Sequence, residues 1–133
     1  MSKFLTTLKV EQVEDNSEDG RGSWRLLAPL AYKSDVAQTI FVAPMGFVTD
    51  FASVPRLPIA YMLTGGYAQA AAVIHDLLYS THEVSRSMAD SVFHEAILSA
   101  GGSKWRAALM YAGVRVGGWT AWDQPGQNPG MEA

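Results

Sequence analysis

Tyr67-Ala-Gln-Ala-Ala-Ala-Val-Ile-His-Asp-Leu-Leu-Tyr79 is the stretch of sequence that decides the fold. It contains no glycine or proline and is rich in alanine, so we predict a helix over residues 67–81. Apolar side chains lie on almost every side of this helix, which should therefore occupy the centre of the protein. His75 and Asp76 interrupt the apolar surface in the middle of the helix. A buried polar pair of this kind needs hydrogen-bonding partners.

Two further helices are predicted after the central one, over residues 86–100 and 103–116. Ser85 or Ser87 can cap the first of them and Ser103 can cap the second, and a glycine pair follows each. We expect five residues of the last helix to contribute to the core: Trp105, Ala108, Leu109, Tyr111 and Ala112.

Before residue 60 the sequence changes to short runs of β-branched and aromatic residues separated by polar turns. These runs predict four strands, over residues 4–11, 23–32, 37–42 and 46–49. The polar, glycine-containing segment at residues 14–23 is typical of a hairpin loop. Short turns between consecutive strands favour antiparallel pairing. The predicted fold class is therefore α+β, with an N-terminal antiparallel β-meander packed on a C-terminal three-helix half.

Length and composition exclude several classes of protein. The 133 residues predict a single domain with a strand-rich half (1–60), a helical half (61–118) and an extended tail (119–133). Hydrophobic residues make up 48% of the chain and charged residues 17%, which argues against disorder and a coiled coil. The absence of cysteine excludes a disulfide scaffold. A net charge of −3 makes nucleic acid a poor partner, and the apolar runs are too short to predict a membrane span.

A polar cluster is predicted where the central helix meets the next one. Tyr79 lies one turn after His75 on the same helix face. Three residues spaced by four form a polar stripe on the following helix: Arg86, Asp90 and His94. A short link makes the two helices antiparallel neighbours, so this stripe can face the His75-Asp76 pair. We predict that Tyr79 and Asp90 lie within hydrogen-bonding reach of His75 or Asp76, and that Arg86 pairs with Asp90.

Three motifs carry a resemblance to a known family: Gly46-Phe-Val-Thr-Asp-Phe-Ala-Ser-Val-Pro-Arg56, Ala72-Val-Ile-His-Asp-Leu-Leu-Tyr79 and Arg86-x-x-Ala-Asp-x-x-Phe93. They resemble the small phage and prophage proteins that form domain-of-unknown-function family 1353. The resemblance runs from about Trp24 to Trp122. It implies a viral or prophage origin, in the virion or the host cytoplasm, and an α+β fold, but no established activity.

A second, local resemblance suggests a mechanism. The pattern His75-Asp76-x-x-Tyr79, with Asp90 on the following helix, is similar to the catalytic helix pair of secreted phospholipases A2. That similarity implies that His75 is a general base for water, that Asp76 binds calcium, and that Tyr79 and Asp90 orient the imidazole. The chain lacks both the disulfides and the glycine-rich calcium loop of that family.

Other interpretations of the same residues remain open. The cluster can be a structural hydrogen-bond network that joins two helices. It can also be a metal-dependent hydrolase site, with Asp50, Asp76 and His94 as candidate Ca²⁺ or Zn²⁺ ligands beside His75 or Asp90. A Ser53, His75 and Asp76 triad is disfavoured, because adjacent helix residues point to different faces. Asp50 or Ser53 can instead cap backbone amides in an end-of-strand turn.

The sequence therefore supports two functional hypotheses. The one we favour is a non-enzymatic phage protein, virion-associated or accessory, that binds phage or host proteins. Trp119 and Trp122 follow the helix-ending glycines; they either fold back onto the sheet or, if they are exposed, form a contact patch. The alternative is a small hydrolase that uses His75. His82 lies in a loop, where we expect it to be solvated, and the sequence does not predict an oligomeric state.

Overall fold

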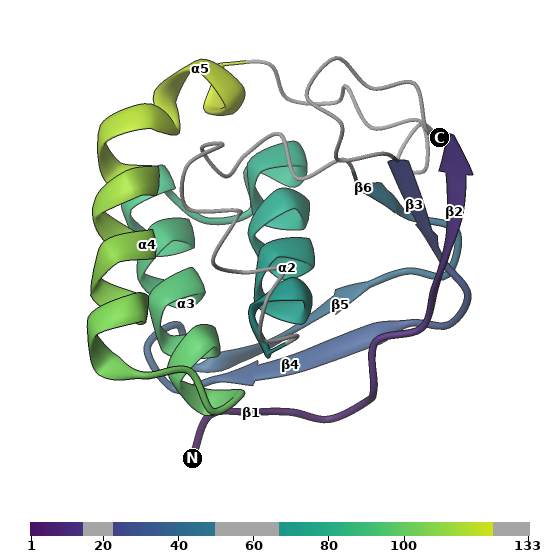
Figure 1. Ribbon diagram of the computed structural model, residues 1–133, viewed down its shortest axis with the longest axis horizontal. Coiled ribbons are helices and arrows are strands. Elements are labelled where there is room, and N and C mark those ends of the chain that lie inside the picture. The colour runs from purple at the N-terminus through teal and green to yellow at the C-terminus, as the bar shows by residue number, and fades with distance from the viewer. Residues whose placement is uncertain (15–22, 50–66, 124–133) are drawn as a thin grey trace.

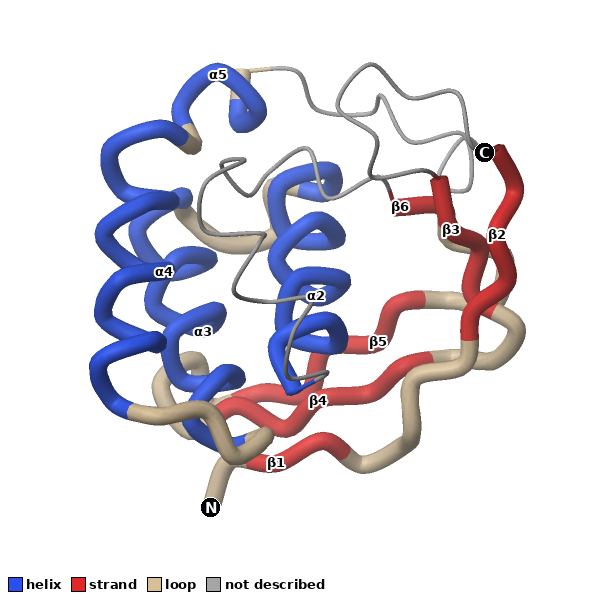
Figure 2. The backbone as a smooth tube through the Cα atoms, viewed as in Figure 1, coloured by secondary structure: helices blue, strands red, loops and turns tan. Residues whose placement is uncertain are grey.

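The computed structural model describes residues 1–14, 23–49 and 67–123 of the chain. Within them the protein is an α+β fold, as predicted, with antiparallel strands in the N-terminal half and helices in the C-terminal half. Three helices lie side by side, and strands lie across their ends and along one side (Figures 1 and 2). Asp50, Ser53 and the predicted strand-to-helix boundary near residue 60 lie outside the described residues.

The strands form two three-stranded antiparallel sheets. The first sheet has the order β1-β4-β5, with β1 at Lys3–Phe4, β4 at Leu30–Ser34 and β5 at Thr39–Ala43. The second has the order β2-β3-β6, with β2 at Val10–Glu14, β3 at Ser23–Leu26 and β6 at Val48–Thr49. The antiparallel pairing of β2 with β3 agrees with the predicted hairpin around residues 14–23.

Two predicted strands are each divided between the two sheets. The predicted strand 4–11 is divided into β1 and β2, and the predicted strand 23–32 into β3 and β4. The chain bends between β3 and β4 at Leu27 and Ala28, just before Pro29, whose ring removes a backbone donor from the ladder. Thr6 lies in the segment between β1 and β2 and connects it to the segment between β3 and β4. Its hydroxyl donates to the Pro29 carbonyl at 3.1 Å and accepts from the Ala31 amide at 3.0 Å.

The three long helices begin and end close to the predicted residues. They are α2 (Tyr67–Thr81), α3 (Arg86–Ser99) and α4 (Lys104–Gly117). Ser85 and Ser103 are the N-caps, and each side-chain oxygen accepts a hydrogen bond from a backbone amide of the first turn. Gly101 follows α3 with φ +101°, a conformation that glycine adopts at little cost. No helix in the described part of the chain is long and apolar enough to cross a membrane.

Helix α3 lies between α2 and α4 and joins the helices to the first sheet. Both α2 and α3 contact β4, whereas α4 packs against α3 at the outer edge of the molecule (Figure 1). Glu95 of α3 connects the layers: its carboxylate accepts hydrogen bonds from Tyr32 (2.7 Å), Ser34 (2.8 Å) and the backbone amide of Val36 (2.8 Å). The core between these elements includes Tyr32, Phe41, Ile74, Leu78 and Phe93.

The predicted core face of α4 was wrong. Trp105 and Leu109 are exposed, as are Ala108 and Ala112, and Tyr111 is only half-buried. The buried residues of α4 are instead Ala107, Met110 and Val114. The buried side chains of α4 form a single stripe, and these three small or flexible side chains pack the helix against α3.

The predicted extended tail begins with a short helix, α5 (Trp119–Trp122). Trp122 is half-buried and its ring meets the Tyr79 ring edge-on at a centroid distance of 5.1 Å. The same indole stacks on His82, with ring centroids 3.6 Å apart and planes 7° from parallel. His82 is therefore exposed but packed, and not simply solvated as predicted.

Candidate functional site

The polar cluster is organised around Asp90, a carboxylate with no exposed surface in the middle of α3. One oxygen, Oδ1, lies 2.7 Å from His75 Nε2 and accepts a hydrogen bond of 2.7 Å from the Tyr79 hydroxyl. The other oxygen, Oδ2, accepts a hydrogen bond of 2.9 Å from Arg115 and lies 3.5 Å from Arg86. Side chains from three helices therefore converge on one buried carboxylate.

Helical spacing places four of these five residues. His75 and Tyr79 are one turn apart on α2, and Arg86 and Asp90 are one turn apart on α3, so each pair shares a helix face. The predicted contacts of Asp90 with His75 and Arg86 are confirmed. The Tyr79 ring packs against the His75 ring, but the Tyr79 hydroxyl donates to Asp90 and not to His75 or Asp76 as predicted. The hydrogen bonds go to Asp90 and not to Asp76.

Arg115 is the member of the cluster that the sequence did not indicate. It lies near the C-terminal end of α4 and adds a third helix to the network. Arg86 contacts the same end of α4, where its guanidinium donates to the carbonyls of Val114 (3.1 Å) and Arg115 (3.3 Å). These carbonyls carry the negative end of the helix dipole, so the arginine also stabilises the end of α4.

The cluster holds Asp90 ionised. Burial alone would raise the pKa of Asp90, but the hydrogen bonds from His75, Tyr79 and Arg115 outweigh burial and lower it. Burial raises the pKa of the Tyr79 hydroxyl, and the hydrogen bond to the Asp90 carboxylate raises it further. Tyr79 therefore remains a hydrogen-bond donor at neutral pH.

His75 is neutral at physiological pH. Complete burial lowers the pKa of its imidazole, and this effect exceeds the opposing influence of Asp90. An ionised carboxylate can only accept, so the proton of the neutral ring lies on Nε2 and the lone pair lies on Nδ1. The ring packs between Tyr79 and Phe93, with centroid distances of 4.2 and 4.6 Å.

Gly118 is a second residue that the sequence did not indicate. A Cβ atom at this position would lie 2.5 Å from the Tyr79 hydroxyl oxygen and 2.5 Å from the Val114 carbonyl oxygen. The close approach of the chain to Tyr79 therefore requires glycine here. The sequence signal was the pair Gly117-Gly118, which predicted the end of a helix and nothing more.

Asp76 belongs to a different contact. It is nearly buried on α2, and its Oδ2 accepts a hydrogen bond from the Thr49 hydroxyl of β6. This bond ties the central helix to the second sheet. Thr49, His75 and Asp76 each make further interactions besides those described above.

The candidate metal ligands remain a prediction. Asp50 lies outside the described residues, and Asp76 is engaged with Thr49. His94 is half-buried, and its ring meets the Tyr111 ring edge-on at 5.6 Å between α3 and α4. Within residues 1–14, 23–49 and 67–123, no group of three or more histidine, aspartate or glutamate side chains is placed to hold a metal ion.

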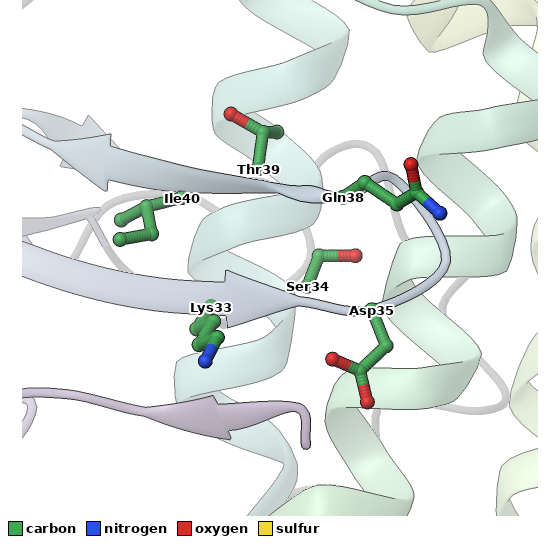
Figure 3. A pocket seen from close by; sticks show the side chains of 6 residues that line it. All are labelled: Lys33, Ser34, Asp35, Gln38, Thr39 and Ile40. Atoms are coloured by element: carbon green, nitrogen blue, oxygen red, sulfur yellow. The ribbon is translucent and has the colours of Figure 1, made fainter.

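A surface hollow of about 740 Å³ lies at the turn between β4 and β5 (Figure 3). It is lined by Lys33, Ser34, Asp35, Gln38, Thr39 and Ile40. Two of its polar groups already serve the fold, because the Ser34 hydroxyl donates to Glu95 and the Asp35 carboxylate lies 3.2 Å from the N-terminal amine. No residue of the Asp90 cluster lines this hollow.

Comparison with known proteins gives a family. No curated protein and no solved structure matches the chain. The sequence pattern of one protein family matches residues 24–114, more than half of the chain. The matched region runs from β3 into α4 and includes His75, Tyr79 and Asp90. The chain therefore belongs to the family described as "Protein of unknown function (DUF1353)".

Proposed function

We propose that this is a non-enzymatic protein of bacteriophage or prophage origin that acts by binding phage or host proteins, in the virion or the host cytoplasm. The proposed role of the Asp90 cluster is structural: it fixes α2, α3 and α4 relative to one another. The observation that carries this proposal is the burial of the cluster. Neither His75 nor Asp90 has exposed side-chain surface.

Burial argues against catalysis because a general base must reach a water molecule or a substrate proton. The hydrogen-bonding capacity of Asp90 is also used within the fold. Its two oxygens accept hydrogen bonds from His75, Tyr79 and Arg115, and the Arg86 guanidinium lies close by. A network in which every charge has a partner is the arrangement that a structural role requires.

Binding to other proteins is supported by the outer side of the helical half. Trp119 is 57% exposed, whereas Trp122 is half-buried beside Tyr79 and His82. Of the two tryptophans considered for a contact patch, Trp119 is therefore the available one. Exposed tryptophan is costly in water and frequent at protein interfaces.

A small hydrolase is the second candidate, and one observation favours it. Asp90 accepts from His75 Nε2 and from Tyr79, which are the orienting contacts that the phospholipase resemblance assigns to these residues. This bond leaves the lone pair of the neutral ring on Nδ1, the atom that would take a proton from water. Asp76 would then be the calcium ligand.

The test compares wild-type protein with His75→Asn in two assays: hydrolysis of phospholipid and nitrophenyl ester substrates, and thermal unfolding with and without Ca²⁺ or Zn²⁺. Asparagine can keep a hydrogen bond to Asp90 but cannot act as a base. His82→Asn is the matched control, because this exposed histidine lies outside the cluster.

If the cluster is structural, we expect the wild-type protein to hydrolyse the substrates no faster than His75→Asn does. We also expect no rise in the Tm of the wild-type protein when Ca²⁺ or Zn²⁺ is added. Hydrolysis that falls about a hundredfold or more in a folded His75→Asn protein, and persists in His82→Asn, would overturn the proposal in favour of the hydrolase. A cation-dependent rise in Tm that requires Asp76 would point the same way.

A further inference from the structure

Strand β5 forms an edge of the first sheet that lacks the usual protection. It is the last strand in the order β1-β4-β5, it contains no proline or charged residue, and its register with β4 is continuous. Natural proteins protect edge strands with charges, prolines or bulges, because unpaired backbone groups otherwise accept another strand. The edge of β5 is therefore a candidate docking surface.

The hydrogen bonds of β4 determine which way each of its residues faces. The Ala31 carbonyl accepts a hydrogen bond from the Leu5 amide, just after β1, at 2.9 Å, and the Ala31 amide donates to the Thr6 hydroxyl at 3.0 Å. Both backbone groups of Ala31 therefore point toward β1 and away from β5. Because successive residues of a strand point their backbone groups to opposite edges, those of Tyr32 point toward β5.

This alternation leaves the backbone groups of Ile40 and Val42 on the open edge. Phe41 lies opposite Tyr32 in the register, so its amide and carbonyl face β4 and those of Ile40 and Val42 face away. Outside the β4–β5 ladder, no residue in the described part of the chain forms a hydrogen bond with Ile40 or Val42. Both residues are accessible, at 52% and 50% exposure. An extended segment laid along this edge can pair with all of these groups.

Two lysines on the same sheet have no acidic partner among the described residues. Lys3 of β1 and Lys33 of β4 lie directly opposite each other, and both are exposed. Like charges in this arrangement repel each other. Asp35, which lines the hollow beside Lys33, pairs instead with the N-terminal amine. The outer face of the sheet is therefore suited to an anionic partner.

Lys33 is placed to reach a segment on the open edge. It lies opposite Ile40, and Figure 3 shows the two side chains on neighbouring strands beside the hollow. A residue opposite Ile40 on an added strand would be the third in this row, with its backbone about 10 Å from that of Lys33. A glutamate at that position and the long lysine side chain can meet over Ile40.

We propose that β5 binds an extended acidic segment of a phage or host protein as an antiparallel fourth strand of the first sheet. Read from its N-terminus, the segment has an apolar residue opposite Val42, one intervening residue, and an acidic residue opposite Ile40. The first position is apolar because Val42 and its β4 neighbour Ala31 form that row. The antiparallel direction lets each of these two residues exchange both backbone hydrogen bonds with β5. This proposal rests on the protein-binding function proposed above and specifies a partner for it.

A second copy of the chain fits this surface less well. Strand β5 of another copy could pair with the same backbone groups, but its sequence Thr-Ile-Phe-Val-Ala brings no acidic residue to Lys33. The repulsion between Lys3 and Lys33 would then stay uncompensated. The charges therefore favour an acidic segment.

The test uses the full chain and a dye-labelled, end-capped peptide, Ser-Thr-Val-Thr-Glu-Thr-Ser, whose binding is followed by fluorescence anisotropy. A segment this short buries far less than the roughly 800 Å² per partner of a standard interface, so we expect a Kd between about 10 μM and about 1 mM. The same peptide with lysine in place of glutamate should bind several-fold more weakly. Absence of binding by the glutamate peptide up to about 1 mM overturns the proposal.

Backbone methylation tests strand addition directly. A methyl group on the valine or glutamate nitrogen of the peptide should abolish binding, because these amides point toward β5. A methyl group on the nitrogen of the threonine between them should have little effect, since that amide points away. Equal effects at the three positions would mean that the peptide does not add as a strand.

Variants of the protein locate the site. Lys33→Glu should weaken binding of the glutamate peptide and strengthen binding of the lysine peptide, whereas Lys104→Glu, at an exposed lysine of α4, should do neither. Val42→Pro should abolish binding with unchanged circular dichroism, because the Val42 amide lies outside the β4 ladder. If this variant does not fold, Lys33→Glu alone decides. Equal peptide affinities of Lys33→Glu and wild-type protein would overturn the site.

Sedimentation of the protein without peptide distinguishes the remaining occupant. If wild-type protein dimerises and Lys33→Glu and Lys104→Glu dimerise equally well, but Val42→Pro does not, a second copy occupies the edge and the proposal is wrong. Failure of peptide binding overturns the β5 site alone. Hydrolysis that depends on His75 would instead overturn the non-enzymatic function and leave peptide binding unchanged.

Discussion

Helix α3 carries two carboxylates that do similar work in different surroundings. Asp90 joins three helices, and Glu95 joins the helices to the first sheet. Asp90 is completely buried and receives two guanidinium groups in addition to His75 and Tyr79. Glu95 is half-buried and receives two hydroxyls and one backbone amide, all of them uncharged.

The comparison teaches that burial and charge decide the cost of losing a carboxylate more than the number of its hydrogen bonds. Without Asp90, water cannot readily replace the lost acceptor and two arginines lose their counter-ion. Without Glu95, no charged group loses its counter-ion, because the donors to Glu95 are two hydroxyls and a backbone amide. The following predictions test this difference, beginning with the largest expected effect.

Asp90→Ala should lower the free energy of unfolding by about 3 kcal/mol or more, because it removes one side of a buried ion pair and orphans several donors. Urea unfolding of the two proteins measures the loss. Asp90→Asn is the matched variant: it keeps the acceptor for Tyr79 but not the charge, so its loss should be smaller. A loss under about 1 kcal/mol for Asp90→Ala would mean that water reaches the cluster after all.

Gly118→Ala should cost about 2 kcal/mol, because the added methyl overlaps the Tyr79 hydroxyl and the Val114 carbonyl. The displaced Tyr79 would also lose its bond to Asp90. Gly117→Ala is the control in the same assay. Gly117 is exposed in the last turn of α4, so alanine there should leave stability unchanged or raise it by up to about 1 kcal/mol. Equal effects at the two glycines would contradict the close packing at Gly118.

Acid should destabilise the protein through His75 before it affects Asp90. The pKa of buried His75 is lowered, so below pH of about 6.5 the unfolded chain binds a proton that the native state does not. The free energy of unfolding should therefore fall as pH decreases, at up to about 1.4 kcal/mol per pH unit from this group. The pKa of Asp90 is also lowered, so its contribution is present above its ordinary value of 3.8 and is lost only at lower pH.

The measurement for this prediction is urea unfolding of wild-type protein and His75→Asn between about pH 7 and about pH 5. The free energy of unfolding of the variant should change less with pH, by up to about 1.4 kcal/mol per pH unit, which corresponds to one proton. Identical slopes would mean that His75 is protonated in the native state. At alkaline pH the sign reverses for Tyr79: its pKa is raised, so stability should fall as the tyrosines of the unfolded chain ionise above about pH 10.

Glu95→Gln should have the smallest effect, a loss of about 1 kcal/mol. The amide keeps one oxygen to accept from Tyr32 or Ser34, and the donor that loses its bond is uncharged. Urea unfolding at neutral pH compares it directly with Asp90→Asn, which makes the same carboxylate-to-amide change. If Glu95→Gln cost more than Asp90→Asn, burial would not be the deciding factor between the two sites.

Much of the site could be predicted because its first contacts are local. The spacing of His75 and Tyr79 places them on one helix face, and a short link after α2 makes α3 its antiparallel neighbour. A polar pair in so apolar a helix needs a partner, and Asp90 is an acidic residue on the facing helix. Arg115 and Gly118 could not be found in this way, since their roles depend on how a third helix packs against the first two.

The amino-acid sequence by itself determined the three long helices, their serine caps and glycine ends, and the α+β class, because these features follow from side-chain periodicity and backbone preferences within a few turns. The tertiary structure decided which face of α4 is buried. Two apolar stripes compete on that helix, and the one that fits against α3 consists of Ala107, Met110 and Val114. It likewise divided the predicted long strands between two sheets. Both outcomes depend on packing between segments far apart in the chain, where complementary shape, and not local hydrophobicity, determines the lower free energy.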